Sequence, residues 1–249
     1  MVGFIKLKKL GKNPFAELPR EVAILSTVSF LVAVGFGLII PAIPIFAASF
    51  GVSKTAIGLI ISAFAIVRFA SGLVSGKLVD KFGERAVLGF GLFMVSFFTF
   101  LTALSQSYAQ LLTFRTLGGL GSSMFSVAAS SVILRSVRDD QRGQVQSIYQ
   151  GSFIVGGMAG PAIGGLLSVI SLRAPFFVYS ILLFCSGLVA LFFLKGDSIG
   201  VKKKSDSDVA ATTIREALAM PAYRIALVLA FIGTWVFFGM RASILPVFV

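Results

Sequence analysis

Two long apolar runs are separated by Gly76-Lys77-Leu78-Val79-Asp80-Lys81-Phe82-Gly83-Glu84-Arg85. We interpret this stretch as a tight charged loop. Gly76 and Gly83 permit a sharp reversal, because glycine adopts positive φ at little steric cost. Lys77, Lys81 and Arg85 place the loop on the cytoplasmic side, since short inside loops carry the cations. Asp80 lies among them, where a helix leaves the bilayer.

The composition is that of an integral membrane protein. The 249 residues are 57% hydrophobic and 13% charged, which is too little charge for the surface of a soluble domain of this length. One cysteine, Cys185, and no histidine exclude a disulfide framework and argue against a metal site. No cofactor is expected. Without histidine, a buried carboxylate pair or an activated nucleophile, enzymatic catalysis is not expected either.

About 20 apolar residues cross a bilayer as a helix, and runs of that length recur along the chain. The predicted spans are 22–46, 56–76, 86–104, 110–132, 145–169, 175–194 and 222–249. The fold class is therefore all-α and membrane-embedded. Its expected parts are a basic arm (1–21), six helices (22–194), a linker with a short surface helix at 209–220 (195–220) and a seventh helix (221–249). The last run reaches Val249 without a polar tail, and we interpret this as a truncation.

The cations predict the orientation. With the N-terminus in the cytoplasm, 17 of the 22 Lys and Arg residues lie inside and only Lys54 and Arg173 lie outside, as the rule for inside loops requires. Topology thus explains the net charge of +12, and nucleic-acid binding becomes unnecessary. The lysines at 202–204 are interpreted as a solvated linker, with contact to anionic lipid as the alternative. A cell membrane, plasma or inner, is the expected location.

Three arginines, Arg68, Arg115 and Arg241, fall well inside predicted spans, away from the span ends. Each costs about 2.5–3.5 kcal/mol at a helix centre, so such residues face an aqueous cavity or a partner. All ten acidic residues fall in loops or at helix ends. A missing segment or the substrate must therefore supply the neutralising group.

The residues after Arg115 favour a cavity. Small and polar residues recur at spacings of three and four, which places them on one helical face. They are Gly118, Gly119, Ser122, Ser126 and Ser130. The alternative is that these small residues only let two helices pack closely, and both readings stay open for them. For Arg115 itself the cavity is favoured, and Gln150 is assigned to the same cavity.

A glycine-rich run lies in the fifth span. Gly156, Gly160 and Gly164 are four residues apart and form a smooth face for another helix, with Gly165 beside them. Pro161 removes one backbone hydrogen bond and is expected to bend the span. A phosphate-binding role is excluded, because no strand precedes these glycines.

Together these motifs resemble those of the major facilitator superfamily. The stretch Gly76–Arg85 is similar to the signature between its helices 2 and 3, and Arg115-Thr-Leu-Gly-Gly119 to its helix 4 motif. Gly156-x-x-x-Gly160-Pro161-x-x-Gly164-Gly165 looks like the helix 5 motif of the exporter branch, the drug:proton antiporters. Gly37-Leu-Ile-Ile-Pro41-Ala-Ile-Pro44 resembles its helix 1 proline signature. The resemblance covers helices 1 through 7.

The resemblance implies roles. Asp80 and Arg85, with Gly76 and Gly83, would form a cytoplasmic latch against the C-terminal half. Arg115 would face the central cavity and take part in proton coupling. The glycines and Pro161 would pack against a helix of the other half. Two six-helix halves, each of 3+3 inverted repeats, would rock about a site near the midplane.

The chain departs from the family pattern by ending in helix 7 and by carrying no carboxylate within its helices. We therefore predict the N-terminal portion of a secondary exporter for a small amphipathic or anionic molecule, with protons as coupling ion. The alternatives are a half-size protein that dimerises or pairs with a separate half, and a non-transporting truncated product. The expected partners are the bilayer, the substrate and the missing C-terminal half.

Overall fold

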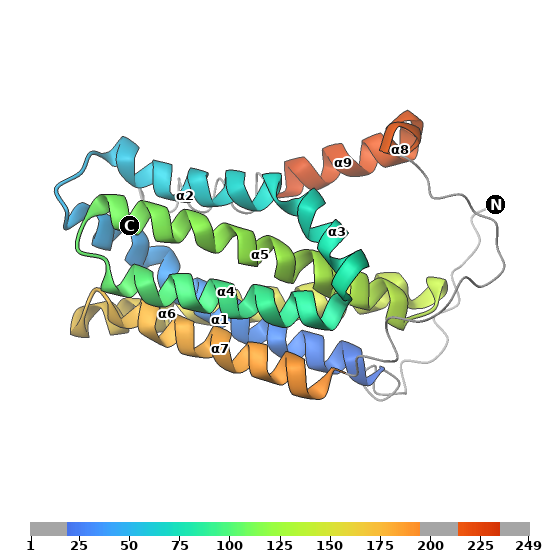
Figure 1. Cartoon of the computed structure of the whole chain (residues 1–249), viewed down its shortest axis with the longest axis horizontal. Helices are drawn as coiled ribbons and strands as arrows, with labels where there is room; N and C mark the ends of the chain where they lie inside the picture. The colour runs from blue at the N-terminus through green and yellow to red at the C-terminus, as the bar shows by residue number, and fades with distance from the viewer. Residues whose placement is uncertain (1–18, 195–213, 235–249) are drawn as a thin grey trace, which may run out of the picture. The chain divides into compact units, whose positions relative to one another are not determined.

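The computed structural model describes residues 19–194 and 214–234, which belong to two compact units, 1–202 and 203–249. Helices make up most of the described residues of both units (Figure 1). The first unit contains α1 (Arg20–Ala48), α2 (Lys54–Ala70), α3 (Gly72–Phe82), α4 (Glu84–Leu104), α5 (Tyr108–Ser136), the 3₁₀ turn η1 (Asp139–Gln141), α6 (Arg142–Ile170) and α7 (Ala174–Phe193). The second contains α8 (Ile214–Ala219) and α9 (Pro221–Thr234).

Polar residues mark several helix starts in the first unit. The Ser53 hydroxyl accepts a hydrogen bond from the Ala56 backbone N–H at 3.3 Å before α2, and Ser107 does the same for Gln110 before α5. Such side chains satisfy amide groups that have no partner within the helix. The short connections 49–53, 105–107 and 171–173 lie at one end of the bundle, and the α3–α4 and α5–α6 connections lie at the other (Figure 1).

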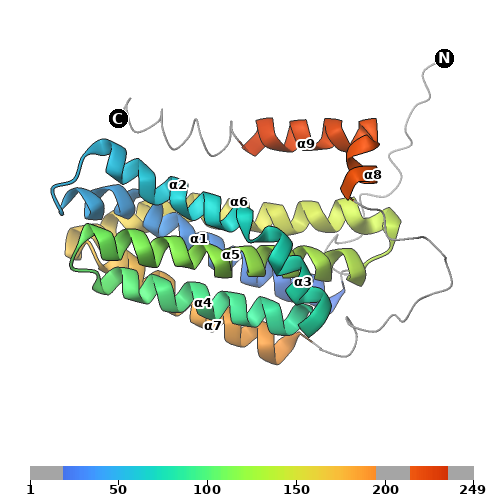
Figure 2. The ribbon, with the colours of Figure 1, turned by 45° about the horizontal axis from the view of Figure 1, so that its top comes forward.

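The helices confirm a multi-pass membrane protein. Five of the described helices, α1, α4, α5, α6 and α7, are long and apolar enough to cross a bilayer, and α2 with α3, bent by 45° at the break between them, counts as a sixth when the pair is taken as one span. Figure 2 shows this bend. The six spans predicted between 22 and 194 agree with these helices to within a few residues, apart from the second. In the second unit, α8 lies within the predicted surface helix and α9 begins the predicted seventh span.

The second predicted span was too short, and the charged stretch after it is not a loop. The chain stays helical through Phe82, so Gly76 lies inside α3, and of these two glycines only Gly83 has a positive φ, at +81°. The reason is that α3 is amphipathic. It buries Ser75 and Val79 against the bundle, so the helix continues past the end of the apolar run.

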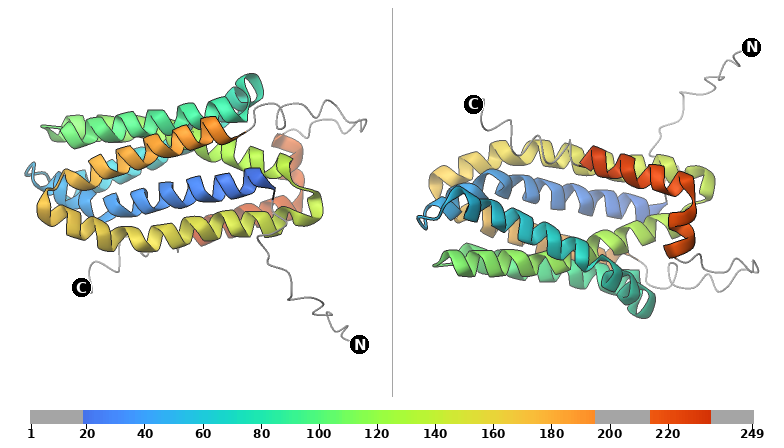
Figure 3. Two further views of the ribbon diagram at one scale, coloured as in Figure 1. Left: turned by 90° about the horizontal axis from the view of Figure 1, so that it is seen from below. Right: turned by 90° about the horizontal axis from the view of Figure 1, so that it is seen from above.

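Helix α1 is central to the packing of the first unit. It lies between α6 and α7, as Figure 3 shows, while α4 packs against α5 and α7. Leu25 and Leu38 of α1, Leu92 of α4, Leu111 of α5 and Phe176 of α7 are fully buried. These residues form a core that joins four helices.

The contact between α1 and α6 depends on glycine. A methyl carbon at Gly160 would lie within 2.6 Å of the Gly37 carbonyl carbon, and one at Gly156 would lie 2.5 Å from the Phe30 carbonyl oxygen. A methyl carbon at Gly164 would likewise clash with the Leu38 backbone. The two helices therefore pack backbone to backbone, as small residues allow in membranes.

The expectation that this glycine face packs against the other half of a transporter was wrong. Gly156, Gly160 and Gly164 all contact α1 of the same bundle. The i, i+4, i+8 spacing identifies a smooth face but not the helix that covers it. Gly165 faces open space, with no atom of the described residues within 4 Å of a methyl carbon placed there, so close packing at this position is also not observed.

Three prolines of the sequence motifs lie inside continuous helices. Pro41 and Pro44 are in α1, and Pro161 is in α6. Each removes one backbone hydrogen bond without ending its helix. The bend expected at Pro161 stays a prediction.

We expect Gly160→Ala to destabilise the bundle by about 1–3 kcal/mol, because the added methyl overpacks a backbone contact. Thermal unfolding of the purified protein, followed by circular dichroism, measures this change. Gly157→Ala is the matched control, because a methyl there meets no atom within 4 Å. Equal melting temperatures for the two variants would show that the α1–α6 contact is not tight.

Candidate functional site

Arg115 is a buried charge in the first third of α5, with 5% of its surface exposed. Its Cζ atom lies 4.3 Å from the centroid of the Phe64 ring of α2. A desolvated cation over an aromatic face gains about 2 kcal/mol. Within residues 19–194, the guanidinium has neither a carboxylate partner nor a hydrogen bond.

Arg68 brings a second guanidinium to the same region from the last turn of α2. Its side chain is exposed, and its Nη2 donates a hydrogen bond to the Ser126 hydroxyl of α5 at 2.7 Å. The Ser126 hydroxyl in turn donates to the Ser122 carbonyl oxygen at 2.8 Å. This chain of bonds ties α2 to the face of α5 on which Arg115 lies.

Two tyrosines complete the group, and neither was predicted from the sequence. The Tyr179 phenol of α7 lies near both arginines, and the Tyr149 phenol of α6 lies near Arg68 and beside the Ser29 hydroxyl. Both tyrosines are buried. Gly35 of α1 makes room for one of them, since a methyl carbon there would lie 2.8 Å from Tyr179 Cε2.

We call Arg68, Arg115, Ser126, Tyr149 and Tyr179 the central polar cluster. Its members come from α2, α5, α6 and α7, so the bundle must be folded for the cluster to exist. The signal that could have found the tyrosines is their rarity, since the chain has only 4 Tyr against 26 Phe. A buried phenol needs a polar partner in a way that phenylalanine does not.

The other predicted cavity residues are placed less closely. Ser122 is half-buried, and its backbone carbonyl oxygen accepts the hydrogen bond from the Ser126 hydroxyl. Gln150 is exposed on α6, next to Tyr149, and makes no hydrogen bond to the cluster. Arg241 lies outside the described residues. Gly119 supports the alternative that the small residues of α5 let two helices pack closely. A methyl carbon at this position would lie 2.8 Å from the Phe64 carbonyl oxygen. A water-filled cavity stays a prediction.

A second polar group lies at the end of the bundle near Gly83. Glu84, the first residue of α4, is only 2% exposed and pairs with Arg135 of α5 at 2.7 Å. The Ser131 hydroxyl donates to the same Glu84 oxygen at 3.2 Å, and Arg135 also lies 3.8 Å from Asp80. The burial of Glu84 was not expected from the sequence, where it looked like a loop acid.

Arg85 also has a partner inside the bundle. It donates a hydrogen bond to the Leu191 carbonyl oxygen in the last turn of α7, where a cation complements the negative end of the helix dipole. Both charged members of the predicted latch, Asp80 and Arg85, thus contact residues of the first unit. Their contact with another half of a transporter stays a prediction.

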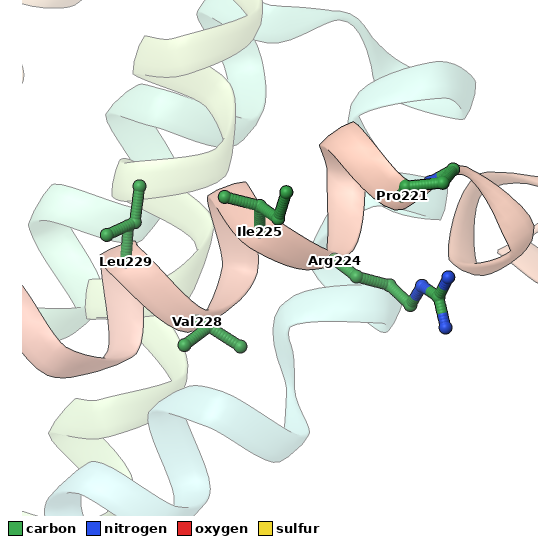
Figure 4. Close-up of a pocket in the computed structure, with 5 residues that line it drawn as sticks. All are labelled: Pro221, Arg224, Ile225, Val228 and Leu229. Atoms are coloured by element: carbon green, nitrogen blue, oxygen red, sulfur yellow. The ribbon is translucent and has the colours of Figure 1, made fainter.

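The second unit has its own small surface feature. Five residues of α9 line a shallow pocket, Pro221, Arg224, Ile225, Val228 and Leu229 (Figure 4). Their side chains are apolar except for Arg224. Among residues 19–194 and 214–234, no group of three or more His, Cys, Asp or Glu side chains could hold a metal ion.

The sequence profile of the Major Facilitator Superfamily matches residues 25–249. The chain is 33% identical over 173 residues to "Multidrug efflux protein YfmO" of Bacillus subtilis (strain 168), covering 70% of this chain and 42% of that protein. It is 26% identical over 162 residues to "Quinolone resistance protein NorA" of Staphylococcus aureus (strain Mu50 / ATCC 700699), covering 64% and 41%. The match thus spans less than half the length of these curated relatives.

Solved structures share the fold. The human organic anion transporter MFSD10 (TETRAN) matches with a TM-score of 0.63 at 21% identity, covering 71% of this chain and 47% of that one. A bacterial homologue of the human lysosomal transporter Spinster matches with a TM-score of 0.66 at 19% identity, covering 81% and 49%. In both cases the matched region is about half of the longer chain.

The Glu84–Arg135 pair is expected to contribute about 1–3 kcal/mol to stability, because one of its charges is buried and hydrogen-bonded. A double-mutant cycle with Glu84→Ala and Arg135→Ala, read from thermal unfolding, measures the coupling free energy. The exposed pair Arg138–Asp140, at 2.9 Å, serves as control and should couple by at most about 1 kcal/mol. Equal coupling in the two pairs would contradict the special role assigned to buried Glu84.

Proposed function

The chain belongs to the major facilitator superfamily, and on this premise we propose that it is the N-terminal portion of a secondary exporter. The proposed substrate is a small amphipathic or anionic molecule, moved by alternating access. The relatives' names, multidrug efflux protein and quinolone resistance protein, support this direction and substrate class. Because the chain spans less than half of those relatives, transport is assigned to the longer assembly and not to these residues alone.

The central polar cluster carries the proposal. Charged side chains deep in a membrane bundle are costly and mark substrate or ion pathways. Here two guanidinium groups and two phenols from four helices converge, and Arg115 has no carboxylate partner among the described residues. In transporters of this architecture, substrate sites lie near the midplane between two halves. We assign Arg68 and Arg115 to that site. We propose no catalytic residue.

Proton coupling forms part of the proposal and needs a carboxylate from elsewhere. Arginine and tyrosine keep their charge states through the physiological pH range, so the central polar cluster does not exchange protons near neutral pH. The described acidic residues lie at helix ends. We therefore place the proton-carrying acid in a second half of the transporter.

That second half is the proposed partner, as part of the same chain or as a separate one. The outer face of α6 supports this, because it exposes many large apolar side chains while its inner face packs on α1. They include Ile154, Val155, Met158, Leu166 and Val169. A half-size protein that pairs with a second copy uses the same face, and is the alternative that this observation also favours.

We expect Arg115→Ala to lower transport about tenfold or more, because it removes a charged group from the proposed site. The full-length transporter is reconstituted in proteoliposomes, and uptake of a fluorescent quinolone is followed with and without a pH gradient. Wild-type transport should fall when the gradient is collapsed, as proton coupling requires.

Arg138→Ala is the matched control, because Arg138 is an exposed arginine at the bundle end and its loss should leave transport unchanged. Arg115→Lys keeps the positive charge. Transport recovered in this variant shows that the loss in Arg115→Ala comes from the missing charge and not from misfolding. Unchanged transport by folded Arg115→Ala would overturn the role given to the central polar cluster.

The orientation of the first unit is a separate prediction. In a Cys185→Ser background, Lys81→Cys and Lys54→Cys each place one exposed thiol at opposite ends of the bundle. A membrane-impermeant maleimide should label position 54 from outside intact cells and position 81 only in inside-out vesicles, since Lys and Arg gather in cytoplasmic loops. The reverse labelling pattern would place the N-terminus outside.

A further inference from the structure

We propose that Arg68 and Arg115 together bind the carboxylate of an organic anion, with the phenol groups of Tyr149 and Tyr179 as neutral hydrogen-bonding partners. The inference rests on the proposed transport function, and it narrows the substrate class of that site to organic carboxylates. It separates the site from one built for organic cations, which two guanidinium groups repel.

The first support is the unmet bonding capacity of Arg115. A guanidinium has five N–H donors and no acceptor. Arg115 is 5% exposed, rests on the Phe64 ring at 4.3 Å, and donates no hydrogen bond to the described residues. Its guanidinium nitrogens are not among the fully buried side-chain atoms without a partner, so they keep some access from outside. An acceptor from outside the protein, water in the empty site and a carboxylate in the loaded one, pairs with these donors.

The second support is the position of Arg68. It approaches the same face of α5 from α2 and uses one N–H group on Ser126. Because its side chain is exposed, the remaining donors are reachable by a ligand. Arg68 and Arg115 both lie near the Tyr179 phenol, so a single small ligand beside that phenol lies within the field of both charges.

The third support is the sign of the charge. The ionisable groups near Arg68 and Arg115 are phenols, and no carboxylate of the described residues is among them. Guanidinium groups match carboxylates in a planar, bidentate geometry. A cationic ligand meets two like charges here and is repelled. The cluster therefore favours a carboxylate over the corresponding amide, and the amide over an ammonium compound.

The test uses three ligands with one aromatic body, 1-naphthoate, 1-naphthamide and (1-naphthylmethyl)trimethylammonium. Their binding to the 249-residue chain in phosphatidylcholine nanodiscs is measured by equilibrium dialysis. We expect naphthoate to bind about tenfold or more tightly than the amide, the range of a charge-assisted hydrogen bond. The ammonium compound should bind most weakly.

Arg68→Gln is the decisive variant, because Arg68 is exposed and its loss should not disturb folding. It should weaken naphthoate binding about 10- to 100-fold and leave naphthamide binding unchanged. Arg68→Lys should recover part of the affinity, because it restores the charge without the planar fork. Arg138→Gln is the matched control and should behave as the wild type.

Two results would overturn the inference. One is equal affinity of the wild-type chain for naphthoate and naphthamide, and the other is an unchanged naphthoate affinity in monodisperse Arg68→Gln. The proposed function fails separately. Naphthoate binding without quinolone transport leaves the anion site standing, whereas transport that ignores both arginines leaves an exporter without this site.

Discussion

A positive charge that has no counter-carboxylate among the described residues, buried among apolar helices, constrains the whole first unit. Arg115 rests on the Phe64 ring and lies near the Tyr179 phenol. The ring and the phenol stabilise the cation less than an ion pair would, because neither of them neutralises its charge. Since Phe64 belongs to α2 and Tyr179 to α7, the arginine can be accommodated only when these helices pack around α5. Chemistry and fold are therefore tied together at this position.

Close backbone approach makes that arrangement possible. Lipid tails are as apolar as leucine, so helices in a membrane associate through tight packing and interhelical hydrogen bonds. Gly35 admits the Tyr179 ring to the surface of α1, Gly119 brings α5 against the Phe64 backbone of α2, and Gly160 meets Gly37 where α1 crosses α6. The close packing at these glycines brings the aromatic and phenolic rings next to the arginines. Larger residues would push the helices apart and break the contacts between the rings and the arginines.

The spans and the intramembrane arginines were predictable because each follows from a local property of the sequence. Hydropathy over about 20 residues locates a span, and a charge within it stands out. The remaining features depend on packing that crosses the chain. The sequence around Glu84 predicts an exposed loop acid, because its ion-pair partner Arg135 lies 51 positions later in the chain. Likewise the glycine stripe of α6 showed its smooth face but not its partner, which is α1.

In the proposed proton-driven exporter, substrate attraction and proton exchange are carried out by different parts of the molecule. The central polar cluster is made of arginine and tyrosine, which hold constant charge near neutral pH, so its attraction for an anion does not change with the proton gradient. A gradient drives transport only through a group that binds protons in one state and releases them in another. In the proposed exporter that group is a carboxylic acid of the second half, and the first half supplies a fixed positive field. Alternating access couples the two, because each rearrangement of the halves changes the distance between that acid and the field of the arginines.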